Sequence, residues 1–94
     1  MSNNTYVGFM CTSLVETLKE KHHDVFENNV VITLTLVNKE NFRQDRSIMA
    51  IDLIDGLLNV FSDKSLIESL SCVEIGYKCQ EEHKLLTSID ILNK

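Results

Sequence analysis

Proline is absent from this 94-residue chain, and glycine occurs only at Gly8, Gly56 and Gly76. These two residue types mark most turns and chain boundaries, so the structural segments must be found from hydrophobic periodicity and from residues that cap helices. No linker, repeat or low-complexity tract divides the sequence. Because single domains commonly hold about 100–150 residues, we expect one domain over residues 1–94.

Long apolar runs are missing as well. The longest uninterrupted apolar stretch has four residues, whereas a membrane-spanning helix needs about 20. Met1–Thr5 has no basic residue or long apolar run that would indicate a targeting segment. Cys11, Cys72 and Cys79 are an odd and sparse set, which favours reduced thiols in a cytosolic protein. We therefore expect a cytoplasmic protein that does not contact membranes.

Basic residues are too few to balance the acidic ones. Nine Lys and Arg stand against fourteen Asp and Glu, which gives a formal charge of -5. Such a charge repels nucleic acid and anionic membrane surfaces. The second half carries most of it, since residues 47–94 hold eight acidic and four basic side chains. We expect no direct nucleic-acid binding and a partner of opposite charge.

The familiar motifs of catalysis and metal binding are not found. Cys72 and Cys79, with His22, His23 and His83, hold enough ligand atoms for zinc. Structural zinc sites, however, use closely spaced cysteine pairs, and no thiol-enzyme signature surrounds any of the cysteines. We therefore expect no metal, no cofactor and no catalytic residues.

Two segments in the first 40 residues have strand character. Val30–Val37 (VVITLTLV) alternates between a fully apolar face and a mixed face, which is typical of a sheet covered on one side. Thr5–Met10 (TYVGFM) holds β-favouring residues and is predicted as a short first strand, with an N-terminal extension as the alternative.

A helix is predicted between these strands. Ser13 and Glu16 have the spacing of a capping box, in which each side chain satisfies a backbone N–H at a helix start. The apolar positions that follow keep to one face from Leu14 to Phe26. Asn28 and Asn29 are expected to end the helix, because asparagine adopts the left-handed conformation more readily than most residues.

The centre of the chain is predicted to hold the core helix. Asn38–Asp45 is a polar connection, although Asn41 and Gln44 form a second possible capping box. From Ser47 to Phe61 polar residues recur every three or four positions, which leaves a wide apolar arc. Gly56 lies inside this helix at a cost of about 1 kcal/mol relative to alanine, so a close backbone approach is one explanation for it.

The C-terminal third is predicted as a short helix and a hairpin. Ser65 and Glu68 form a third capping box. Val73–Cys79 alternates as a strand with one buried face, Gln80–Lys84 is the polar loop, and Leu85–Leu92 is the second strand, with a terminal helix as the alternative. The predicted order is β-α-β-α-α-β-β. It indicates an α+β domain in which helices cover one face of a three- or four-stranded, mainly antiparallel sheet.

An acidic stripe is the candidate site. Residues spaced by three and four share one helix face, and four of them here carry carboxylate or amide groups: Asp52, Asp55, Asn59 and Asp63. Glu81 and Glu82 in the hairpin loop are expected to extend this surface. The plainer interpretation is a solvated helix face.

These features suggest a small acidic inhibitor that binds and neutralises a basic protein such as a toxin or another nucleic-acid enzyme, as immunity and anti-defence proteins do. Carboxylates offered in place of phosphates suit a basic cleft. A homo-oligomeric adaptor or secretion chaperone, paired as a homodimer through the apolar arc of residues 48–61, is the alternative. An enzyme of unrecognised type is the third.

Overall fold

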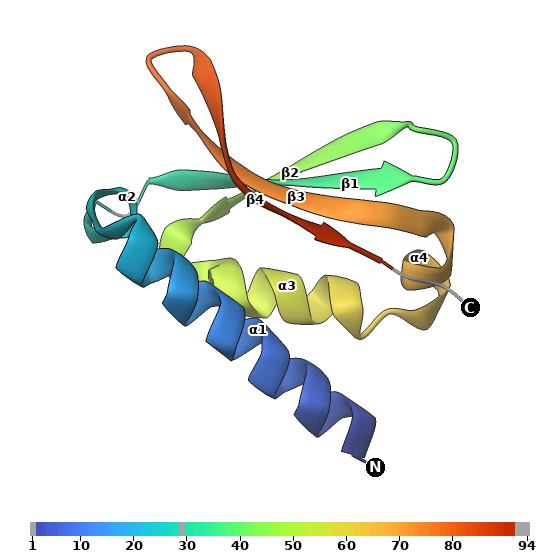
Figure 1. The fold of residues 1–94 in the computed structure, drawn as a ribbon. Coiled ribbons are helices and arrows are strands. Elements are labelled where there is room, and N and C mark those ends of the chain that lie inside the picture. The colour runs from blue at the N-terminus through green and yellow to red at the C-terminus, as the bar shows by residue number, and fades with distance from the viewer. Residues whose placement is uncertain (1, 29, 92–94) are drawn as a thin grey trace.

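The computed structural model describes residues 2–28 and 30–91, with the side chains described from residue 6 onward (Figure 1). Its elements follow in the order α1 (Ser2–Lys21), α2 (His23–Glu27), β1 (Val31–Asn38), β2 (Arg43–Met49), the 3-10 helix η1 (Ala50–Asp52), α3 (Leu53–Phe61), α4 (Lys64–Ser69), β3 (Leu70–Cys79) and β4 (Glu82–Asp90).

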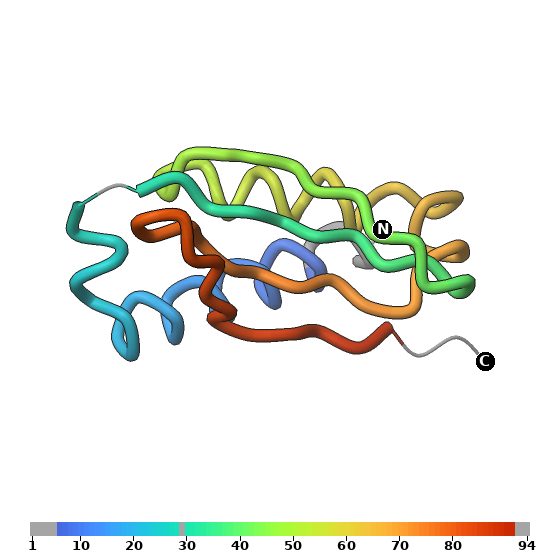
Figure 2. The backbone as a smooth tube through the Cα atoms, turned by 90° about the horizontal axis from the view of Figure 1, so that it is seen from above, coloured from blue at the N-terminus to red at the C-terminus, as the bar shows by residue number. Residues whose placement is uncertain are grey.

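The four strands form one antiparallel sheet in the order β2-β1-β3-β4, so β1 and β3 are central and β2 and β4 are edges. Helices α1 and α3 cover one face of the sheet and leave the other face open (Figure 1). Seen from above, α3 lies beneath the β2 side of the sheet, and α1 lies further toward β3 and β4 (Figure 2). This confirms the α+β class, the antiparallel sheet and the one-sided helical cover.

The core lies between the sheet and this helical layer. Every second residue of β1 points into it, and Ile32, Leu34 and Leu36 are all buried, as expected from the strand period of two. Their cross-strand neighbours on β3 and the inner faces of α1 and α3 complete the core: Val73, Ile75, Cys11, Val15, Leu18, Leu53, Leu57 and Val60. No helix of the described residues is both long enough and apolar enough to span a bilayer.

The prediction for the N-terminal segment is wrong. Thr5–Met10 is helical, because α1 runs unbroken from Ser2 to Lys21, and the Ser13–Glu16 pair lies inside the helix and caps nothing. Cys11, Val15 and Leu18, spaced by four and three, fix one buried stripe. The packing of these three residues against the core overrides the local strand preference, which is only a weak determinant of structure.

The predicted helix end is only partly correct. The chain leaves α1 at His22 and makes one further short helix, α2, to Glu27. Asn28 follows as its C-terminal cap with φ of −90°, so it is not left-handed as expected. Asn29 lies outside the described residues.

A strand replaces the expected polar connection and the start of the core helix. Arg43–Met49 is β2, paired with β1 along its whole length. The core helix is therefore shorter than Ser47–Phe61, since η1 starts at Ala50 and α3 at Leu53. The alternative capping box is also wrong, because Asn41 sits in the β1–β2 loop at a positive φ of 70° and Gln44 belongs to β2.

The C-terminal predictions are largely confirmed. A short helix, α4, is present, but its cap is Asp63, whose carboxylate accepts a hydrogen bond from the Leu66 backbone N–H, and not Ser65. The hairpin is tighter than expected, since only Gln80 and Glu81 separate β3 from β4. The strand interpretation of 85–92 is confirmed up to residue 90, and residue 92 lies outside the described chain.

Candidate binding surface

The acidic stripe is exposed and follows the length of α3. Asp52 ends η1, Asp55 and Asn59 lie on α3, and Asp63 follows it as the cap of α4. All four side chains are exposed. The helix is shorter than predicted, so the spacing argument applies only to Asp55 and Asn59, and Asp52 and Asp63 flank α3 at its two ends.

The stripe residues of α3 point away from both α1 and the sheet. A Cβ at Gly56 would lie 2.8 Å from Ile48 Cδ1 of β2, so that side of α3 faces the sheet. Leu58 points to α1, because its Cδ2 is 3.9 Å from a Cβ built at Gly8. With about 100° per residue, Asp55 and Asn59 fall on a third side of α3, turned away from the buried Leu53, Leu57 and Val60.

The carboxylates of the stripe are not neutralised within the described chain. The described residues form the ion pairs His23–Glu27, Arg43–Glu74 and Glu82–Lys84, and no residue of the stripe takes part in any of them. Asp63 uses one carboxylate oxygen to cap α4. The negative charge of the stripe is therefore available to a partner.

Glu81 and Glu82 do not extend this surface. They lie at the tip of the β3–β4 hairpin, which rises on the side of the sheet opposite the helices (Figure 1). Glu82 is also 3.8 Å from Lys84 Nζ, so its charge is partly balanced locally. The structure thus brings together four of the six predicted site residues and separates the other two.

The neighbouring edge strand was missed by the sequence analysis. β2 pairs with β1 from Arg43 to Met49 without a register shift, and its other side has no strand partner among the described residues. Alternate N–H and C=O groups of such an edge point outward and can pair with another chain. The signal available in the sequence was the polar NKEN turn directly after the clear strand Val30–Val37.

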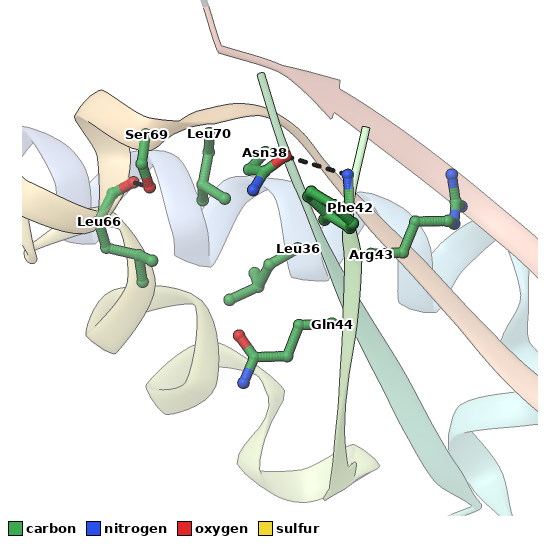
Figure 3. A pocket seen from close by; sticks show the side chains of 8 residues that line it. All are labelled: Leu36, Asn38, Phe42, Arg43, Gln44, Leu66, Ser69 and Leu70. Carbon is green, nitrogen blue, oxygen red and sulfur yellow. Dashed lines mark hydrogen bonds between the residues drawn. The ribbon is translucent and has the colours of Figure 1, made fainter. Parts of the chain in front are cut away.

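A small cavity lies at the end of β2, between the β1–β2 loop and α4 (Figure 3). We call it the pit. Its volume is about 200 Å³, and it is lined by Leu36, Asn38, Phe42, Arg43, Gln44, Leu66, Ser69 and Leu70. The Phe42 side chain is 70% exposed at its rim, whereas Leu36 and Leu70 are buried beneath it.

The loop at the rim of the pit is held by specific hydrogen bonds. The Asn38 side-chain oxygen accepts hydrogen bonds from the backbone N–H of Glu40, at 2.8 Å, and of Phe42, at 3.0 Å. The Lys39 N–H donates to the Ser69 carbonyl oxygen at 3.1 Å, which ties the loop to α4. Phe42 is thus presented by a fixed backbone, which favours its use as a contact residue.

Two polar contacts hold side chains on the open face of the sheet. The Thr35 hydroxyl donates to Asp45 Oδ1 at 2.7 Å, and Arg43 of β2 pairs with Glu74 of β3 across strand β1. These contacts cover Thr35 and Val37, which are only 3% and 4% exposed although alternation turns them to the open face. The Arg43 side chain therefore points away from the pit, as Figure 3 shows.

The thiols and imidazoles do not assemble into a site. Among the described residues no group of three or more His, Cys, Asp or Glu side chains is placed to hold a metal ion. Burial raises the pKa of the Cys11 thiol, so this thiol is a poor source of the reactive thiolate. Cys72 is half-buried and Cys79 is exposed.

Comparison of this chain with protein-family models, curated proteins and solved structures found no match.

Proposed function

We propose that this protein is a small binding protein that attaches to a basic protein through the acidic stripe and thereby neutralises it. The observation that supports the proposal is that the stripe carboxylates are exposed and unpaired within the described chain, in a protein whose formal charge is already -5. Such a surface attracts a basic partner over long range and raises the rate of association.

Inhibition follows from the kind of partner that carries complementary charge. Toxins and enzymes that act on nucleic acid bind phosphates with clusters of Lys and Arg. A row of carboxylates can occupy such a cluster in place of phosphates, and the bound domain then blocks access of the nucleic acid. A toxin or other nucleic-acid enzyme is therefore the class of partner that this surface fits best.

The oligomeric adaptor is the weaker candidate. Its motivation was the apolar arc of residues 48–61, but Leu53, Leu57 and Val60 of that arc are buried within the monomer. Of this arc, Met49 and Ile51 remain exposed, and Tyr6 and Phe9 on α1 are exposed as well.

The test is capture of partners from the native cell at low salt, where exposed charges are least screened. The tagged protein is compared with the Asp52→Asn, Asp55→Asn, Asp63→Asn variant, and retained proteins are identified by mass spectrometry. Asparagine at position 63 keeps the helix cap, because it caps as well as aspartate. We expect the unsubstituted protein to retain a basic protein in stoichiometric amount and the variant to lose it.

A matched control removes the same charge elsewhere. Glu16, Glu20 and Asp24 are exposed on α1 and α2, away from the stripe. The Glu16→Gln, Glu20→Gln, Asp24→Asn variant should retain the partner. Equal retention by both variants, or equal loss from both, would refute the stripe as the binding surface.

A further inference from the structure

The two edges of the sheet are not equivalent, and only β2 keeps the regular geometry that strand addition requires. The β1–β2 ladder runs over seven residue pairs without a shift. The β3–β4 ladder shifts between Ile75 and Gly76, and such bulges twist an edge away from further pairing. β2 contains no proline, and its charged side chains, Arg43, Asp45 and Arg46, restrict the strands that can pair with it.

Three features of complementary chemistry meet along this edge. β2 offers its open backbone, the pit rimmed by Phe42 lies at its end, and α3, which carries part of the acidic stripe, lies beneath the β2 side of the sheet (Figure 2). Helix α3 holds nine residues, or about 14 Å at 1.5 Å per residue, with Asp52 and Asp63 just beyond its two ends. An added strand covers this length with about five residues, of which three point to the same face at intervals of about 6.7 Å.

We propose that β2 binds an extended segment of the partner as a fifth strand, with basic side chains at alternate positions facing the acidic stripe and one apolar side chain in the pit. This inference rests on the proposed function, because it names the form in which the basic partner is bound. Main-chain hydrogen bonds supply affinity in such strand addition, and the alternate side chains supply specificity.

Charge determines the occupant. A second copy of this chain would bring the same three aspartates to the edge of β2, and the like charges would repel. Arg46 is on the helix-facing side of β2, as its register with Leu34 shows. The charge of Arg46 repels a basic side chain placed directly opposite it on the added strand. It therefore favours registers in which the basic residues of that strand lie on either side of Arg46.

The test uses capped synthetic peptides and the full-length protein. The lead peptide is Leu-Thr-Lys-Thr-Lys-Thr-Lys, in which the leucine and all three lysines share one face of an extended strand. A scrambled peptide of the same composition, Lys-Thr-Thr-Lys-Lys-Leu-Thr, removes the alternation. A third peptide repeats the lead sequence with the backbone nitrogens of the threonines methylated, and a fourth with those of the lysines methylated.

Strand addition predicts a specific pattern of affinities. The lead peptide should bind at least about tenfold more tightly than the scrambled peptide, and one of the two methylated peptides should lose about tenfold, because only one set of N–H groups faces β2. The amides of residues 43–49 should become protected from hydrogen exchange. The Phe42→Ala variant should weaken the lead peptide but not a peptide with glycine in place of leucine.

The outcomes separate this inference from the proposed function. One possible result is that all four peptides bind alike, lose affinity for the Asp52→Asn, Asp55→Asn double variant and keep their affinity for the Glu16→Gln, Glu20→Gln double variant. This result would mean that the acidic stripe binds basic partners and that strand addition is refuted. Strand addition is also refuted if the lead peptide binds the protein no more tightly than the scrambled peptide does, whatever the affinity of the two. Capture from the native cell then decides the proposed function independently.

Discussion

At the scale of single residues, Gly56 sets how closely α3 approaches the sheet. A Cβ there would lie 2.8 Å from Ile48 Cδ1 and 3.4 Å from Leu34 Cδ1. Alanine gains about 1 kcal/mol of helix propensity, but overpacking a core costs roughly 1–3 kcal/mol. We expect Gly56→Ala to lower the free energy of unfolding by about 1 kcal/mol in urea titrations.

The Ile48→Val background tests the cause of this loss. Valine lacks the Cδ1 atom that a Cβ at position 56 would meet, whereas Leu34 Cδ1 is within reach of a small adjustment. In this background Gly56→Ala should be neutral or stabilising, which gives a coupling of about 1 kcal/mol between the two sites. The same cost in both backgrounds would show that Ile48 is not the residue for which Gly56 makes room.

At the scale of elements, the β1–β2 hairpin depends on one side chain in its loop. The Asn38 side-chain oxygen accepts two backbone N–H groups, and each such bond contributes about 0.5–1.5 kcal/mol net. Asn38→Ala should therefore lower the free energy of unfolding by about 1–2 kcal/mol and speed exchange of the Glu40 and Phe42 amides. Asn38→Asp keeps the acceptor and should lose far less, so equal losses would contradict this role of the side chain.

Elements with a buried face could be predicted from the sequence. β1 alternates apolar residues because one of its faces contacts the helices, and β3 does so for the same reason. β2 was missed because it is an edge strand whose side chains from Arg43 to Ser47 are all exposed, so no alternation is imposed on them. Periodicity reports burial, and an element that buries little leaves little trace in its sequence.

The candidate site follows the same division. The pairing of Asp55 with Asn59 was predictable because residues four apart share a helix face wherever the helix begins, whereas the positions of Asp52 and Asp63 depend on where α3 starts and ends. The pit and the open edge were not, since Phe42, Leu66 and Leu70 meet only when the sheet register and the position of α4 are known. The separation of Glu81 from the stripe likewise depends on which way the β3–β4 hairpin turns.

At the scale of the whole molecule, a single sheet and a single helical layer share one core. The Cα atoms extend over 38 × 30 × 17 Å, so the domain is thin, with one helical layer on one sheet face. Cys11 of α1 is buried in the same cluster as Leu53 of α3 and Ile75 of β3. Because these residues share a cluster, we expect α1 and the sheet to unfold together.

The pH dependence of stability tests this shared core through Cys11. Burial raises the pKa of its thiol, so above about pH 9 the unfolded chain releases a proton that the folded chain keeps. Stability should be unaffected below this pH and should fall above it, by up to about 1.4 kcal/mol per pH unit.

The measurement compares urea unfolding from pH 7.5 to 10, under reducing conditions, for a Cys72→Ser, Cys79→Ser protein with and without Cys11→Ala. Lysine and tyrosine titrations are common to both proteins and cancel in the difference. The difference between their unfolding free energies should be constant up to about pH 9 and then shrink, because only the protein with Cys11 loses stability through this thiol. Parallel curves throughout would mean that the Cys11 thiol reaches water while the sheet is still folded, and therefore that α1 opens as a separate unit.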